Sequence, residues 1–140
     1  LKGDRVAVND DIAAIKSISR DVQLKVILET GKLQNLTNVR HASELAIEAG
    51  ADFIKTSTGK YDPAATEEAV LVMLDTIHEY YRNTGIIVGI KPAGGIREPL
   101  QAFHYLCLVY HVLGAQWLGP DSFRIGASKL AERVLQELRA

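Results

Sequence analysis

Three short apolar runs, each containing a lysine, decide the fold of this chain: Leu24-Lys25-Val26-Ile27-Leu28, Asp52-Phe53-Ile54-Lys55-Thr56-Ser57 and Val88-Gly89-Ile90-Lys91-Pro92. Short, β-branched runs that are apolar through most of their length are typical of parallel strands covered on both faces. The lysines recur at intervals of about 30 to 36 residues, close to the length of one strand–helix–strand unit. The runs therefore predict a parallel sheet built from repeated units.

The segments between the runs have the apolar spacing of amphipathic helices. Asn9 or Asp10 is a plausible N-cap of the first helix, Gly50 is placed to end the second, and Thr66 is placed to cap the third. The predicted helices cover residues 8–18, 36–49, 66–81, 99–113 and 127–138, and the predicted strands cover 24–28, 51–57 and 86–91. Short apolar runs at 116–118 and 123–126 precede the last helix. This alternation predicts an α/β fold.

Two architectures fit this alternation: an open doubly wound sheet, and part of a (β/α)8 TIM barrel. In a barrel, catalytic groups project from the C-terminal ends of several strands. Lys55 and Lys91 both stand near strand ends, before loops that contain Ser, Thr and Gly, and this favours the barrel. A full barrel takes about 250 residues, whereas about four β/α units are visible and the first residue is Leu. Residues 1–140 are expected to be the second half, the C-terminal portion of a single barrel domain.

Composition excludes several classes of protein. The chain of 140 residues is 47% hydrophobic and 24% charged, with a net charge of −1, as in an ordinary soluble domain. A charge so near zero does not indicate a nucleic-acid partner. No apolar stretch approaches the roughly 20 residues that span a bilayer, and no signal peptide is visible. We expect a cytoplasmic protein without a membrane partner.

Cysteine and histidine give no metal-binding pattern. The single Cys107 stands in an apolar run, which predicts a buried structural thiol. The four histidines (His41, His78, His104 and His111) fall in predicted helices and make no ligand spacing with Cys107. No phosphate-binding P-loop or dinucleotide fingerprint is present. The sequence therefore predicts neither a metal nor a cofactor.

The lysines near the strand ends suggest amine chemistry. Alternation along a strand puts Phe53, Lys55 and Ser57 on one face, and Pro92 restricts Lys91 to an extended backbone. Adjacent parallel strands lie about 4.8 Å apart, so the two ammonium groups can approach and lower the pKa of one of them. A neutral lysine amine is a nucleophile that forms imines with aldehydes and ketones.

Each lysine taken alone has a plainer interpretation. A lysine at a strand end can extend its ammonium group to solvent, and Lys25, at the start of its run, fits that interpretation at least as well. The pair of Lys55 and Lys91 is therefore the stronger signal, with Lys25 a possible third member of the site.

Glycine-rich loops follow the same strands. Gly59-Lys60 follows the second run, Gly94-Gly95 follows the third, and Gly126-Ala127-Ser128 opens the last predicted helix. Such loops let backbone N–H groups approach an anion, and barrels commonly bind phosphate at the loops after their last two strands. Each loop could also be a turn that needs glycine for its backbone conformation and binds no ligand. Together with the lysines, the loops suggest a phosphorylated carbonyl substrate.

Four motifs resemble the deoxyribose-phosphate aldolase family, in order and over essentially the whole chain. They are Leu24-Lys25-Val26-Ile27-Leu28-Glu29-Thr30-Gly31, Asp52-Phe53-Ile54-Lys55-Thr56-Ser57-Thr58-Gly59-Lys60, Lys91-Pro92-Ala93-Gly94-Gly95-Ile96-Arg97 and Arg124-Ile125-Gly126-Ala127-Ser128. The resemblance implies a TIM barrel and a class I aldolase that uses no metal. Such an enzyme reversibly cleaves 2-deoxy-D-ribose 5-phosphate to glyceraldehyde 3-phosphate and acetaldehyde, a step of deoxyribonucleotide catabolism. A homo-oligomer is possible.

The resemblance also implies roles for residues of this chain. Lys55 matches the catalytic lysine that forms the Schiff base, and Lys91 matches a second catalytic lysine that lowers the pKa of Lys55 and takes part in proton transfer. Lys25 matches a further lysine of the substrate pocket. The residues that match positions around the phosphate are Gly59, Lys60, Gly94, Gly95, Gly126 and Ser128.

This sequence departs from the family pattern in two places. Lys129 stands where the family often has a second serine, and a cation there could strengthen phosphate binding or point to solvent. The proton-relay aspartate of the family lies on a strand upstream. Leu1-Lys2-Gly3-Asp4 resembles the loop after that strand, and Asp4, Asp10 and Asp11 do not match the aspartate.

Two alternatives to a deoxyribose-phosphate aldolase remain. One is a phosphate-binding half barrel without turnover, and the other is a Schiff-base aldolase for another phosphosugar. A half barrel would expose strand edges and an apolar inner face. We therefore expect the isolated 140 residues to dimerise, aggregate or fold poorly, and to show little activity.

Overall fold

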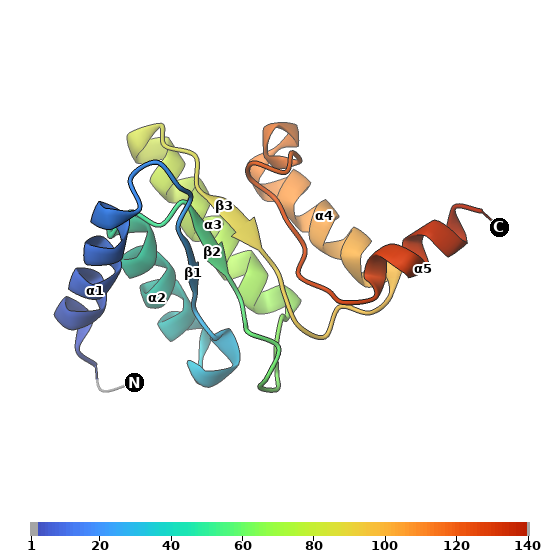
Figure 1. Ribbon diagram of the computed structural model, residues 1–140, viewed down its shortest axis with the longest axis horizontal. Helices are drawn as coiled ribbons and strands as arrows, with labels where there is room; N and C mark the ends of the chain where they lie inside the picture. The colour runs from blue at the N-terminus through green and yellow to red at the C-terminus, as the bar shows by residue number, and fades with distance from the viewer. Residues whose placement is uncertain (1–2, 140) are drawn as a thin grey trace.

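A computed structural model describes residues 3–139 of the chain, and strands and helices alternate along it (Figure 1). The elements, in order, are α1 (Arg5–Ile18), β1 (Lys25–Ile27), the 3-10 turn η1 (Thr30–Lys32), α2 (Leu36–Glu48), β2 (Phe53–Lys55), α3 (Glu67–Thr84), β3 (Gly89–Lys91), α4 (Pro99–Leu113), the 3-10 turn η2 (Ala115–Trp117) and α5 (Leu130–Glu137). Each helix contacts the next one along the chain, and α1 and α5 lie at opposite ends of the molecule. The predicted α/β fold is confirmed.

The three strands form one parallel sheet in the order β1-β2-β3. A fourth segment extends this sheet through two isolated parallel bridges, Ile90 to Phe123 and Ala93 to Gly126. Backbone hydrogen bonds accompany the bridges: Arg124 N–H donates to Ile90 O at 3.1 Å, and Gly126 N–H donates to Pro92 O at 2.8 Å. Neighbouring strands are thus consecutive along the chain, as in one half of a barrel.

The helix ends follow from local sequence. The Thr66 hydroxyl accepts a hydrogen bond from Ala69 N–H and caps α3, as predicted. Asn35 caps α2 in the same way through Asn38 N–H, and Gly50 follows α2 with φ at 98°, a conformation that favours glycine. Caps of this kind satisfy backbone groups that have no partner inside the helix.

The core lies between the sheet and the helices. Val26, Ile54, Ile90 and Phe123 form one row across the sheet, because each residue is the register partner of the next. Ile54 and Ile90 are fully buried in a cluster that includes the apolar face of α3. Trp117 is a buried member of this cluster, and its indole Nε1–H donates to Val88 O at 3.0 Å. Burial of such side chains contributes about 1.5–3 kcal/mol each.

The boundaries differ from the prediction in several places. Helix α1 begins at Arg5 because Asp4, rather than Asn9 or Asp10, accepts the capping bond from Ala7 N–H. The strands are shorter than predicted, and α5 begins at Leu130, so 127–129 belongs to the preceding loop. Residues 115–117 form a 3-10 turn. Leu1 and Lys2, part of the loop suggested by the family resemblance, lie outside the described residues.

The prediction of a buried Cys107 is wrong. The thiol is exposed on α4, a helix that also exposes Phe103, Leu106 and Tyr110, so an apolar neighbourhood in the sequence does not place the residue in the core. The four histidines lie on helices α2, α3 and α4, as predicted. Among the described residues, no helix has both the length and the apolar character needed to cross a bilayer.

Candidate functional site

The three strand lysines share one face of the sheet. Ile27, Lys55 and Lys91 are register partners in a single row, and Lys25 stands two positions before Ile27 on β1. Side chains two positions apart on a strand point to the same side. The lysine face is therefore the side of the sheet opposite Ile54, and the predicted orientation of Lys55 is confirmed.

The lysines are half-buried and act on one another. Burial lowers the pKa of Lys91 below its ordinary value, and the positive charges of Lys25, Lys55 and Arg124 lower it further, in that order. Both causes disfavour the protonated amine. The pKa of Lys91 is thus lowered first by burial and then by its like-charged neighbours.

Arg124 is a member of this face that the sequence did not single out. The bridge between Ile90 and Phe123 places Arg124 beside Lys91, and its guanidinium carbon lies 4.4 Å from the centre of the Phe53 ring. Alternation along Phe123, Arg124 and Ile125 places Arg124 on the face opposite its two neighbours. The sequence indicates that this is the lysine face only when 123–126 is known to pair with β3.

Two hydroxyl side chains hold the ends of β2 and β3 together. Thr56 Oγ1 accepts from Ala93 N–H at 2.9 Å and donates to Ala93 O at 3.1 Å. Ser57 Oγ donates to the same carbonyl at 2.9 Å. Thr56 and Ser57 are fully buried, and buried polar groups are stabilising only when they are paired in this way. The clamp fixes the backbone that carries Lys55 and Lys91.

The glycine loops meet at the same edge of the sheet. Gly94, with φ at 87°, approaches Gly59 so closely that a Cβ added to Gly94 would lie 3.0 Å from Gly59 Cα and 2.6 Å from Ala64 Cβ. A Cβ on Gly126 would lie 2.6 Å from Ala93 Cβ and 3.1 Å from Lys91 Cε. Only glycine fits at these positions, which explains why the loops after the strands are rich in it.

Two of the predicted phosphate-binding amides are already paired within the protein. Gly94 N–H donates to Gly126 O at 3.3 Å, and Gly126 N–H donates to Pro92 O at 2.8 Å. These two glycines therefore serve the close approach of the loops. The three loops also carry exposed residues: Lys60 after Gly59, Gly95 after Gly94, and Ser128 after Gly126.

A carboxylate supports the loop after β2. Glu29, at the end of β1, accepts hydrogen bonds from the backbone N–H of Thr58 at 3.1 Å and from its hydroxyl at 2.6 Å. Glu29 adopts a left-handed backbone with φ at 53°, which is unusual for a residue other than glycine. The contact holds the loop of Gly59 and Lys60 against the end of β1.

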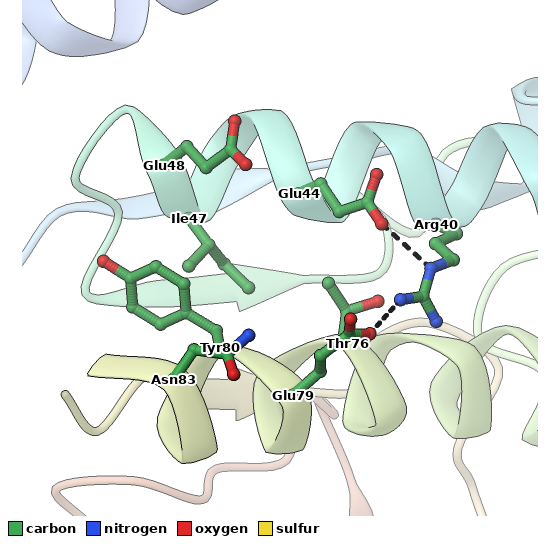
Figure 2. A pocket seen from close by; sticks show the side chains of 8 residues that line it. All are labelled: Arg40, Glu44, Ile47, Glu48, Thr76, Glu79, Tyr80 and Asn83. Atoms are coloured by element: carbon green, nitrogen blue, oxygen red, sulfur yellow. Dashed lines mark hydrogen bonds and ion pairs between the residues drawn. The ribbon is translucent and has the colours of Figure 1, made fainter. Parts of the chain in front are cut away.

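A groove between α2 and α3 is separate from the lysine face. Figure 2 shows Arg40 pointing toward two carboxylates: its Nε donates to Glu44 at 2.8 Å, and its Nη2 pairs with Glu79. Hydrogen bonds to Glu79 and Glu44 raise the pKa of Arg40. The groove is lined by Arg40, Glu44, Ile47, Glu48, Thr76, Glu79, Tyr80 and Asn83. No residue of the lysine face lines it, so we assign it a structural role in joining the two helices.

The described residues contain no cluster of three His, Cys, Asp or Glu side chains that could hold a metal ion. The ionisable groups of the lysine face are amines and one guanidinium. Neutral amines form imines with carbonyl compounds, and burial together with the surrounding cations favours the neutral form of Lys91.

Comparison with known proteins gives relatives of one kind. Over 138 residues the chain is 45% identical to the deoxyribose-phosphate aldolase of Mus musculus and 44% identical to that of Homo sapiens. Each alignment covers 99% of this chain and 43% of the relative. The chain therefore spans less than half the length of these curated relatives.

Solved structures agree in fold. The apo form of a candidate deoxyribose-phosphate aldolase from Toxoplasma gondii matches with a TM-score of 0.86 and 26% identity, over 94% of this chain and 52% of that one. A deoxyribose phosphate aldolase from Aeropyrum pernix, described as a tetramer, matches with a TM-score of 0.66 and 26% identity, over 97% of this chain and 50% of that one.

The family model for DeoC/LacD family aldolases matches residues 3–104, which include β1, β2, β3 and their lysines. The match covers well over half of the chain and agrees with both the parallel sheet and the lysine face. This chain belongs to the DeoC/LacD family of aldolases.

Proposed function

We propose that this chain carries the Schiff-base lysine, its partner lysine and the phosphate loops of a deoxyribose-phosphate aldolase. The observation that carries the proposal is the register of the sheet, which pairs Lys55 with Lys91 on one face below the glycine loops. The proposed fold is the C-terminal portion, residues 1–140, of a single (β/α)8 barrel domain. The consecutive strand order supports a barrel, since a doubly wound sheet reverses its order at a switch point.

In the proposed reaction, neutral Lys55 Nζ attacks C1 of the open-chain sugar, and water leaves to give a protonated imine. Loss of the C3 hydroxyl proton then breaks the C2–C3 bond. The bonding electrons move into the imine and form an enamine, while C3 becomes the aldehyde of glyceraldehyde 3-phosphate. Protonation of the enamine and hydrolysis release acetaldehyde and restore Lys55.

Lys91 is the proposed proton-transfer partner of Lys55. Its lowered pKa increases the share of neutral amine near pH 7 and allows it to accept and return a proton. Lys25 is proposed to contribute a further positive charge to the pocket.

The proposed phosphate site is the edge formed by the loops after β2, β3 and the 123–126 segment. Gly59, Gly94 and Gly126 allow these loops to meet. Exposed groups at the edge would then bind the anion: Lys60, Gly95 N–H and Ser128, with Lys129 as an additional cation. We place the enzyme in the cytoplasm, as a possible homo-oligomer with small-molecule substrates and no nucleic-acid or membrane partner.

A chimaera tests the proposed activity. The matching 138 residues of the mouse relative are replaced by this chain, and acetaldehyde release from 2-deoxy-D-ribose 5-phosphate is measured. We expect turnover that falls at least about a thousandfold in Lys55→Met, because loss of a covalent nucleophile removes its whole reaction path. Lys32→Met, on the 3-10 turn η1, is the matched control.

The same chimaera separates the alternatives. A folded chimaera that binds inorganic phosphate without turnover would favour the phosphate-binding half barrel. Turnover of another phosphosugar, with none of deoxyribose phosphate, would favour a different Schiff-base aldolase. Either result would overturn the proposed function.

A further inference from the structure

Arg124 crosses the lysine face from one side of the sheet to the other. Its backbone belongs to the segment that pairs with β3, and its Nη2 donates to Gln23 Oε1 at 2.8 Å, just before β1. Its Nε donates to Pro120 O at 2.8 Å. The side chain thus joins the last segment of the sheet to the start of the first strand.

The middle of this side chain lies over an aromatic ring. The guanidinium carbon of Arg124 is 4.4 Å from the centre of the Phe53 ring, a distance at which a cation is attracted to the ring face. The ring in turn lies against Gly89, where an added Cβ would come within 2.3 Å of it. Gly89, Phe53 and Arg124 therefore stack in that order on the lysine face.

The guanidinium also differs chemically from its neighbours. Lysine amines lose their protons when they react or titrate, whereas arginine stays charged at every pH a protein withstands. The charged groups that face Lys91 are Lys25 on β1, Lys55 on β2 and Arg124, and all three lower the pKa of Lys91. When Lys55 forms an imine, the charge of Arg124 is unaffected.

We propose that Arg124 is a positioning residue of the lysine face: it holds Phe53 as the floor of the site and keeps a permanent positive charge beside Lys91. Its backbone register and three side-chain contacts fix that charge in place. The inference rests on the proposed function, in which Lys91 exchanges protons with the substrate.

NMR titration of lysine Cε signals in the chimaera with the mouse relative tests this role without requiring turnover. In Arg124→Met, the pKa of Lys91 is expected to rise, because a fixed cation has been removed. In Arg124→Lys it is expected to stay nearer the parent value, because the charge remains. Arg20→Met is the matched control, since exposed Arg20 makes a comparable contact with Ser17 O on α1 and should leave Lys91 unchanged.

A folded Arg124→Met protein with the parent pKa of Lys91 would overturn the inference, as would an equal rise in Arg124→Lys. If Arg124→Met does not fold, Gln23→Leu is the second test. Loss of the hydrogen bond to Gln23 should let the guanidinium move and raise the pKa of Lys91, and an unchanged pKa would overturn the role of Arg124. Imine trapping with acetaldehyde is run in parallel. If the parent protein forms no imine, only the proposed function is contradicted. If the parent forms an imine but the pKa of Lys91 is the same in Arg124→Met, only the role of Arg124 is contradicted.

Discussion

The two faces of the three-stranded sheet differ in role: one packs against the helices, and the other carries the lysines. Toward the helices, the row of Val26, Ile54 and Ile90 is apolar and joins the core. On the opposite face, the row beginning one residue later holds Ile27, Lys55 and Lys91. A shift of one residue along the same strands separates stability from chemistry, because successive side chains point to opposite sides.

Because the two faces differ in this way, the protein tolerates several cations in strands that are otherwise apolar. The face of the sheet that packs against the helices stabilises the fold. The lysine face carries positive charges that repel one another. Stability and reactivity can therefore be changed almost independently, and substitutions on the two faces test that separation.

The largest expected effect on stability is that of Ile90→Ala. Ile90 is fully buried against the helices, so its truncation should lower the free energy of unfolding by about 2–5 kcal/mol, through lost burial and a residual cavity. Urea unfolding of the chimaera measures the change. The matched control is Ile27→Ala, because Ile27 is 42% exposed on the lysine face and its truncation should cost less than about 1 kcal/mol. Equal losses in the two variants would contradict the assignment of the faces.

A smaller effect of opposite sign is expected for Lys91→Met. The pKa of Lys91 is lowered in the folded protein, so between its folded and unfolded pKa values the unfolded chain binds more protons and stability rises with pH. Below both values the ammonium group opposes folding. Lys91→Met should therefore unfold at higher denaturant concentration near pH 7, by on the order of 0.5 kcal/mol.

This gain should shrink as the pH rises toward the ordinary lysine value of about 10.4. Unfolding measured from pH 7 to pH 10 follows the trend, with the exposed Lys129→Met as control. A loss of stability at pH 7, or a gain that does not change with pH, would show that repulsion among the cations is not the cause.

The part of the site that the sequence predicts depends on short-range patterns. Alternation in the second run orients Lys55, and the repeated strand–helix unit brings Lys91 beside it. The glycine loops fall at the predicted edge because parallel strands of one sheet end together. The pattern does not predict that the N–H groups of Gly94 and Gly126 are used to join the loops, because these bonds form between separate segments.

The parts that the sequence does not predict depend on contacts between distant segments. Arg124 meets Gln23 across 101 residues, and nothing near either residue in the sequence indicates this contact. Helix α1 begins earlier than its apolar spacing suggests because a polar residue, Asp4, sets its start. Cys107 is exposed since its helix is apolar on more sides than the core covers.

The central claim is that one particular lysine of this face forms the imine, and peptide mapping tests it most directly. The chimaera is incubated with acetaldehyde, reduced with borohydride, digested and analysed by mass spectrometry to locate the reduced adduct. Lys25, Lys55, Lys60 and Lys91 are all candidates by position, so the map decides among them. We predict a single adduct on Lys55 that disappears in Lys55→Met; a folded protein that forms no adduct, or one modified at the other lysines and not at Lys55, would contradict the account.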